Sequence, residues 1–155
     1  MDQAATIGLT ETRELSTALD WDTRAQPGSK QVLLAEDEPM IRNLMQRLLH
    51  SWGYRVFAAR NGREAMEIAE RHKGEIDLLV SDVTMPEMDG PELAAKLKAK
   101  RPRLQVILLS GYSHSEFVLQ RGWIFIHKPF QMQELRVAIE DSLEAQQPLT
   151  KGVVD

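Results

Sequence analysis

Short apolar runs alternate with amphipathic stretches along most of the chain. Five runs have the near-continuous apolar character of buried strands: Val32–Ala35, Val56–Ala59, Leu78–Ser81, Val106–Leu109 and Trp123–His127. Between and after them, apolar residues recur at helical spacing, which predicts amphipathic helices around 41–49, 65–69, 93–97 and 135–142. Buried strands separated by helices are typical of βαβ units. The pattern therefore predicts an α/β fold with a parallel sheet that helices cover on both faces.

The two ends of the chain lack this pattern. Residues 1–30 show weak periodicity and finish in a run of turn and linker formers, Gln26-Pro27-Gly28-Ser29-Lys30. We expect a tail or linker over 1–30, one folded domain over 31–145 and a shorter tail over 146–155. Trp21 is a large apolar residue for a tail, and its docking on the domain or on a partner stays open.

One connection inside the domain is irregular. Thirteen residues, Ser110–Gly122, separate the fourth apolar run from the fifth, and they contain a single segment, His114–Arg121, with room for about two helical turns. We expect the fourth helix to be shortened or irregular.

Composition narrows the class of protein further. A chain of 155 residues with 43% hydrophobic content suits one domain with a single core. The absence of cysteine excludes disulfides, thiolate nucleophiles and cysteine zinc sites, and the four histidines have no tight metal-ligand spacing. The net charge of −4 argues against direct nucleic-acid binding. No apolar run approaches the roughly 20 residues of a membrane span, so we expect a cytoplasmic protein without membrane insertion.

Polar side chains follow the ends of four predicted strands. In an open parallel sheet, ligands bind outside the carboxyl ends of the strands. The residues expected at that edge are three acids, one hydroxyl and one lysine: Glu36, Asp37, Asp82, Ser110 and Lys128. Each alone has a simpler interpretation, since acids after strands often cap helices and a serine or lysine in a turn is usually only solvated. Their convergence on one edge favours a site.

Three carboxylates close together repel one another unless a cation lies between them. A hard divalent ion such as Mg²⁺ prefers oxygen ligands and commonly combines one or two carboxylates with phosphate oxygens. Phosphoryl chemistry is therefore the natural use of such a site, with a carboxylate able to act as the nucleophile. A phosphatase that forms an acyl phosphate would need a second aspartate two residues after Asp82, where this chain has Thr84.

These residues lie in segments that resemble the receiver domains of two-component response regulators. The matching segments are VLLAEDEP at 32–39, LLVSDVTMPEMDG at 78–90, VILLSGY at 106–112 and FIHKPF at 125–130. Together they span essentially all of 31–145. The resemblance implies a flavodoxin-like, doubly wound, five-stranded parallel sheet in the order 2-1-3-4-5.

The same resemblance implies roles for individual residues. Asp82 would accept a phosphoryl group from a phosphohistidine on a sensor histidine kinase or phosphotransfer protein. Mg²⁺ would be held by Asp37 directly, by Glu36 through water, by Asp82 and by the backbone carbonyl of Thr84. Ser110 and Lys128 would each contact a phosphoryl oxygen. Phe125 would be an aromatic switch, and Thr84 and Tyr112 would tune the rate of hydrolysis. A cis peptide bond would precede Pro129.

Output and assembly stay open at the level of sequence. No recognisable output module follows residue 145, so we expect either a stand-alone receiver that switches the binding of a downstream protein or the receiver fragment of a hybrid histidine kinase. The shortened fourth connection also keeps open a phosphorylation-independent interaction module. It leaves a homodimer open as well, because the dimer surface of many relatives includes that helix. The implied activity is a self-phosphorylating switch, not a conventional enzyme.

Overall fold

The computed structural model describes residues 28–111 and 122–146. In chain order these residues form β1 (Gln31–Ala35), α2 (Pro39–Ser51), β2 (Arg55–Ala59), α3 (Gly62–Arg71), β3 (Leu78–Asp82), α4 (Gly90–Lys100), β4 (Gln105–Ser110), β5 (Ile124–His127) and α6 (Met132–Gln146). The predicted alternation of strands and helices is confirmed. None of the helices in these two ranges is long and apolar enough to cross a membrane.

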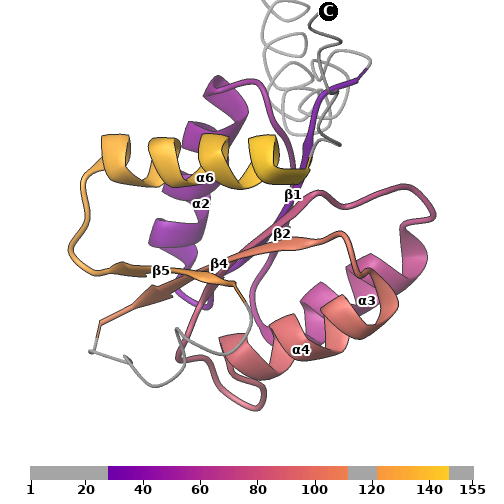
Figure 1. The fold of residues 1–155 in the computed structure, drawn as a ribbon. Coiled ribbons are helices and arrows are strands. Elements are labelled where there is room, and N and C mark those ends of the chain that lie inside the picture. The colour runs from indigo at the N-terminus through magenta and orange to yellow at the C-terminus, as the bar shows by residue number, and fades with distance from the viewer. Residues whose placement is uncertain (1–27, 112–121, 147–155) are drawn as a thin grey trace, which may run out of the picture.

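All five strands form one parallel sheet in the order β2-β1-β3-β4-β5. The order confirms the predicted 2-1-3-4-5 topology. It reverses direction between β1 and β3, since the chain moves outward from β1 to β2 and then returns past β1 to β3. Helices α2 and α6 lie on one face of the sheet and α3 and α4 on the other (Figure 1). The crevice at this reversal is where such folds bind ligands.

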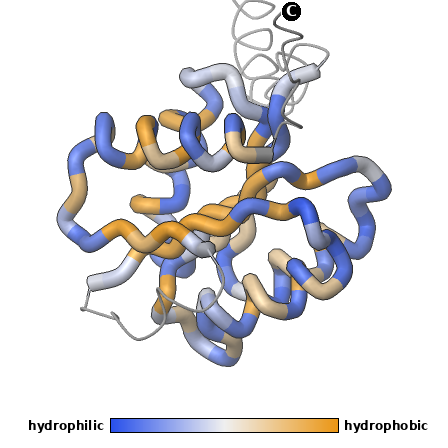
Figure 2. The backbone as a smooth tube through the Cα atoms, viewed as in Figure 1, coloured by the Kyte–Doolittle hydropathy of each residue, from blue (hydrophilic) through white to orange (hydrophobic). Residues whose placement is uncertain are grey.

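Each face of the sheet carries its own hydrophobic core. Successive strand residues point to opposite faces, so Leu33 packs toward α3 and α4 while Leu34 packs toward α2 and α6, both with no exposed surface. Figure 2 shows the hydrophobic positions running along the strands through the middle of the molecule. Burial on both faces explains why the strands read as continuous apolar runs and do not alternate.

The helices on the two faces begin differently. The side chains of Asn61 and Asp89 cap α3 and α4, each accepting a hydrogen bond of 2.8 Å from the third backbone N–H beyond it. Helix α2 begins at Pro39, but the residue before it, Glu38, makes no side-chain capping bond. The simple explanation of the acidic run as a helix cap therefore does not hold at Glu38.

The strand ends differ slightly from expectation. Strand β4 extends one residue beyond the predicted apolar run at each end, to Gln105 and Ser110, and β5 begins at Ile124, so Trp123 precedes it as a buried residue. The predicted irregular helix at 114–121 and the two predicted tails lie largely outside the described residues.

Candidate functional site

An acidic cluster lies at the carboxyl edge of the sheet, where β1 and β3 end. Glu36 directly follows β1 and Asp82 is the last residue of β3. One carboxylate oxygen from each of Glu36, Asp37 and Asp82 lies within 4.8 Å of the others. The sequence predicted this convergence, because these acids follow apolar runs and the carboxyl ends of parallel strands lie at one edge of the sheet. The three residues differ in exposure: Glu36 is buried, Asp82 is half-buried and Asp37 is exposed.

Lys128 reaches this cluster from the end of β5. Its Nζ lies 3.2 Å from Oδ1 of Asp82 and 3.6 Å from Oε2 of Glu36. The backbone fixes its approach, because the N–H of Lys128 donates a 2.7 Å hydrogen bond to the carbonyl of Ser110. One cation thus faces three carboxylates, which leaves the described site with an excess of negative charge.

Burial, with a smaller contribution from the neighbouring carboxylates, raises the pKa of the two more buried carboxyl groups. Burial raises the pKa of Glu36 above its usual value of 4.5, and the nearby Asp82 charge raises it further. Burial also raises the pKa of Asp82 above 3.8, while Lys128 opposes that rise and Asp37 adds to it. Both shifts mean that removing these carboxylates from water costs more free energy than the attraction of Lys128 supplies.

A divalent cation fits the donors present. Glu36 is 1% exposed, and its Oε1 accepts a 3.2 Å hydrogen bond from the N–H of Glu38. Its other oxygen, Oε2, is buried without a hydrogen-bond partner among the described residues. Oxygen donors of this kind, with surplus negative charge and one unsatisfied oxygen, suit a hard ion such as Mg²⁺.

The other predicted site residues lie around this cluster. Ser110 ends β4 beside it and is 2% exposed, and Thr84 lies exposed in the loop after β3. Phe125 pairs in register with Leu108 and is half-buried against the core under α3 and α4. The Lys128–Pro129 peptide bond is cis, as predicted. Tyr112 lies outside the described residues.

Two residues that the sequence reasoning passed over also shape the site. Nη1 of Arg42, on the first turn of α2, donates to the carbonyls of Glu36 and Asp37 at 3.0 and 3.5 Å. Gly90 opens α4 so close to β3 that a Cβ atom there would overlap the carbonyl oxygen of Asp82. The arginine three residues after Pro39 and the Asp-Gly pair were the sequence signals for them.

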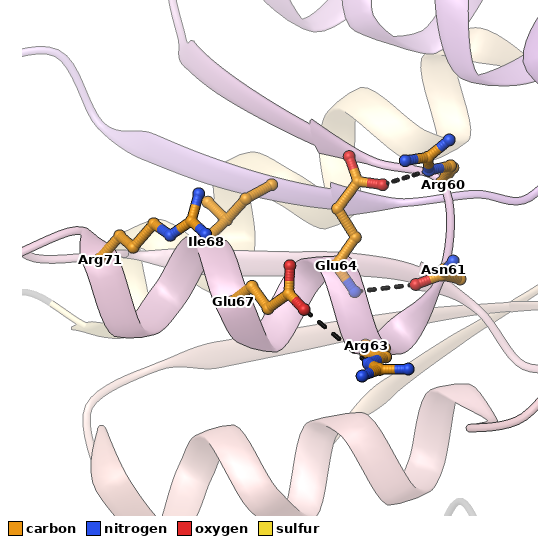
Figure 3. A pocket seen from close by; sticks show the side chains of 7 residues that line it. All are labelled: Arg60, Asn61, Arg63, Glu64, Glu67, Ile68 and Arg71. Atoms are coloured by element: carbon orange, nitrogen blue, oxygen red, sulfur yellow. Dashed lines mark hydrogen bonds and ion pairs between the residues drawn. The ribbon is translucent and has the colours of Figure 1, made fainter.

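A hollow of about 390 Å³ lies away from this cluster, along α3 (Figure 3). Two of its three arginines form ion pairs with glutamates of α3: Arg60, just before the helix, with Glu64 at 2.6 Å and Arg63 with Glu67 at 3.8 Å. Such exposed pairs are each worth only tenths of a kcal/mol. We interpret this surface as a solvated helix face.

The fold, the acidic cluster and Lys128 together define a class of protein, and comparison with known proteins identifies the family. The family model of the response regulator receiver domain matches residues 32–140. The chain belongs to this family.

Curated relatives include longer proteins. The sensor kinase CckA of Brucella abortus (strain 2308) is 42% identical over 123 residues, which cover 77% of this chain and 13% of that protein. The transcriptional regulatory protein GlrR of Escherichia coli (strain K12) is 35% identical over 123 residues, 77% of this chain and 27% of that protein. The chain therefore spans well under a third of either of these two relatives.

Solved receiver domains agree with the fold. The receiver domain of the hybrid histidine kinase CckA aligns with a TM-score of 0.64 and 38% identity, covering 73% of this chain and 98% of that one. The response regulator TrrA of Thermotoga maritima, solved in complex with Mg²⁺ and BeF, aligns with a TM-score of 0.64 and 33% identity, covering 74% of this chain and 99% of that one.

Proposed function

We propose that this chain is a phospho-accepting switch in which Asp82 takes a phosphoryl group from the phosphohistidine of a sensor histidine kinase or phosphotransfer protein. The observation that carries this proposal is the packing of three carboxylates within 4.8 Å of one another against a single lysine. An excess of buried negative charge costs stability, so a site that keeps it is arranged for a cationic ligand and a charged substrate.

The transfer forms one bond to phosphorus and breaks another. An oxygen of Asp82 forms a bond to phosphorus while the phosphorus–nitrogen bond to histidine breaks, and the electron pair leaves with the imidazole nitrogen, which takes up a proton. The carboxylate nucleophile becomes an acyl phosphate. Lys128, which already contacts Asp82 at 3.2 Å, stabilises one oxygen of the transferred group. The Ser110 hydroxyl donates a hydrogen bond to another oxygen of that group.

Mg²⁺ held by Asp37, Asp82 and the Thr84 carbonyl, with Glu36 behind a water, would neutralise charge on the transferred group. The Oε2 atom of Glu36, which is buried and has no hydrogen-bond partner among the described residues, supports this assignment. The TrrA neighbour supports it too, because that receiver was solved with Mg²⁺ and a beryllium fluoride group. Phe125, Thr84 and Tyr112 would read out or tune the phosphorylated state.

The family match supports a receiver over about 31–145, with the segments 1–30 and 146–155 outside it. We place the exchange in the cytoplasm, and we propose that phosphorylation changes the binding of a downstream protein. The similarity to the CckA sensor kinase supports the alternative that this chain corresponds to the receiver part of a hybrid kinase.

The test is phosphorylation of the full chain by acetyl phosphate with Mg²⁺, followed by intact mass measurement. We expect one added phosphoryl group in the wild type, none in Asp82→Asn and none when a chelator removes the metal. Asp77→Asn is the matched control, because Asp77 is a buried aspartate that directly precedes β3 at the amino end of the sheet, outside the acidic cluster, and it should keep the adduct.

Absence of an adduct in the wild type, with beryllium fluoride also failing to bind, would contradict the proposal. If partner binding in pull-downs were then the same for wild type and Asp82→Asn, the phosphorylation-independent interaction module would replace it.

A further inference from the structure

A small hollow opens at the amino end of the sheet, opposite the acidic cluster. It has a volume of about 150 Å³ and is lined by the residues around the starts of β3 and β4: Glu75, Ile76, Arg101, Pro102, Arg103 and Leu104. Its floor is apolar and closed, since Ile76 is 4% exposed and Leu104 1% exposed. The hollow therefore suits one apolar side chain.

Cations surround this apolar floor. The guanidinium of Arg101 is held rigidly by hydrogen bonds of 2.8 to 3.0 Å to the carbonyls of Ala69, His72 and Gly74. Nζ of Lys98 donates to the carbonyl of Pro102 at 3.3 Å. These bonds hold the cations in place, and none of their acceptors is a carboxylate, although the carbonyls at the end of α3 offset part of the Arg101 charge.

Arg103 completes the rim. It meets Glu75 at 4.0 Å, with both side chains more than two-thirds exposed, and such a pair contributes little. The charged residues that line the hollow, Arg101, Arg103 and Glu75, leave a net charge of +1, and Lys98 adds a further positive charge next to Pro102. An occupant with an apolar side chain and adjacent negative charges would match both the floor and the rim.

The chain enters the domain beside this hollow. Nζ of Lys30 lies 3.7 Å from Oδ1 of Asp77, and the N–H of Gln31 donates a 2.7 Å hydrogen bond to the same carboxylate. Asp77 directly follows Ile76 of the hollow's floor, and its carbonyl accepts from the N–H of Gln105, which follows Leu104. The described chain therefore begins its first strand beside the residues that line the hollow.

The segment that precedes Lys30 carries a matching motif. Trp21 is flanked on both sides by acids, Asp20 and Asp22, and residues 1–27 hold five acids and two arginines, a net charge of −3. These residues lie outside those that the structure describes. Nine residues from Trp21 to Lys30 can span up to about 30 Å, enough to turn back onto the adjacent loops.

We propose that the N-terminal segment docks in cis on the domain, with the Trp21 indole in the hollow and Asp20 and Asp22 beside Arg101 and Arg103. Charge complementarity and the point of chain entry favour this occupant over a second copy or another protein. A docked aromatic side chain removes about 150–250 Å² from water. The segment would cover the loops before β3 and β4 and leave the carboxyl edge with Asp82 open, so this proposal stands independently of phosphorylation.

Disulfide trapping in the full chain tests the docking, because the protein has no cysteine of its own. The pair Thr23→Cys and Pro102→Cys places one thiol next to Trp21 and one on the exposed loop of the hollow. We expect intramolecular cross-linking under mild oxidation. Adding Trp21→Ser to the same pair should slow it about tenfold, because the tether is unchanged and only the anchor is lost.

Charge exchange tests the rim. Arg103→Glu in the cysteine pair should slow cross-linking, and further reversal of Asp20 and Asp22 to lysine should restore much of the rate. A rate unaffected by Trp21→Ser and by Arg103→Glu would overturn the proposal, since the cross-link would then report only random collisions of a tethered chain. Disulfide-linked dimers as the main product would also overturn it, because they would make a second copy the occupant.

A cysteine-free measurement guards against a cross-linking artefact. Fluorotryptophan labelling of the full chain gives one ¹⁹F signal for each of Trp21, Trp52 and Trp123. The Trp21 signal, assigned by its loss in Trp21→Phe, should lie away from its position in denaturant and move toward it in Arg103→Glu. A Trp21 signal already at the denatured position in the wild type would refute the docking.

Discussion

The two ends of the sheet both carry a half-buried or buried aspartate from the same stretch of chain, yet their surroundings differ. At the amino end, Asp77 is 6% exposed, accepts the Gln31 N–H at 2.7 Å and faces Lys30 at 3.7 Å. At the carboxyl end, Asp82 shares one lysine with two further carboxylates. One aspartate is balanced by its partners, and the other belongs to a cluster with surplus charge.

Asp77 and Asp82 are only five residues apart, yet the first carries a structural charge and the second a functional one. A carboxylate with one cation and one amide donor ties β1 to β3 and needs nothing more. Crowded carboxylates weaken the fold, which Asp82 shows through its raised pKa, because burial and Asp37 outweigh the help of Lys128. Surplus charge of this kind is retained where a metal or substrate will meet it.

The largest expected effect comes from Gly90, at the carboxyl end. A Cβ atom in Gly90→Ala would overlap the backbone carbonyl of Asp82, and backbone cannot swing aside as a side chain can. We expect a loss of about 3 kcal/mol in the free energy of unfolding and slower phosphorylation, because relief must move Asp82. Urea unfolding and the adduct assay measure the two effects.

Gly62→Ala is the matched control for this substitution. Its Cβ would lie 3.0 Å from the Cβ of Met88 and 3.1 Å from its Cγ and Sδ, a contact that a shift of a few tenths of an ångström relieves, so it should cost less stability than Gly90→Ala and leave phosphorylation unchanged. Equal effects of the two alanines would mean that close packing near Asp82 does not position the site.

At the amino end, Asp77→Ala should destabilise the fold by about 2 kcal/mol, because the part-buried Gln31 N–H loses its acceptor. Phosphorylation of the remaining folded protein should be unaffected. Thermal unfolding combined with the adduct assay checks both statements. If Asp77→Ala instead abolished the adduct at temperatures where the protein is folded, the division of labour between the two ends would be wrong.

The sequence predicted one of these ends better than the other. Glu36, Asp82 and Lys128 could be placed together because each follows an apolar run and parallel strands share a carboxyl edge. The strand order itself came from the resemblance, since periodicity does not determine which strands are neighbours. Mg²⁺ and the roles of Ser110 and Thr84 remain predictions.

Contacts that depend on tertiary geometry were not predictable. The sequence gives no signal for the role of Asp77, because its partners Lys30 and Gln31 are 46 or more residues away along the chain. Nothing in the sequence around Arg101 indicates that its guanidinium binds three carbonyls near the end of α3. Backbone hydrogen bonds of this kind leave no periodic signal in the sequence.

The smallest expected effect is a gain of stability at the site itself. Asp82→Asn removes one of three crowded carboxylates, and its raised pKa means that the folded state disfavours the charged form. Without Mg²⁺ the variant should therefore be more stable than the wild type by on the order of 1 kcal/mol at neutral pH. The gain should shrink as the pH is lowered, because the wild-type carboxyl then takes up a proton in the folded state before it would in the unfolded one.

Added Mg²⁺ should reverse the ranking. A ligand that binds only the folded protein stabilises it in proportion to its affinity, and that affinity falls when a carboxylate ligand becomes an amide. Thermal unfolding of both proteins across a Mg²⁺ titration measures this directly, with Ca²⁺-free buffer and chelator as the starting point. A wild type that stays less stable than Asp82→Asn at every Mg²⁺ concentration would show that the surplus charge at the carboxyl end is not there to hold a metal.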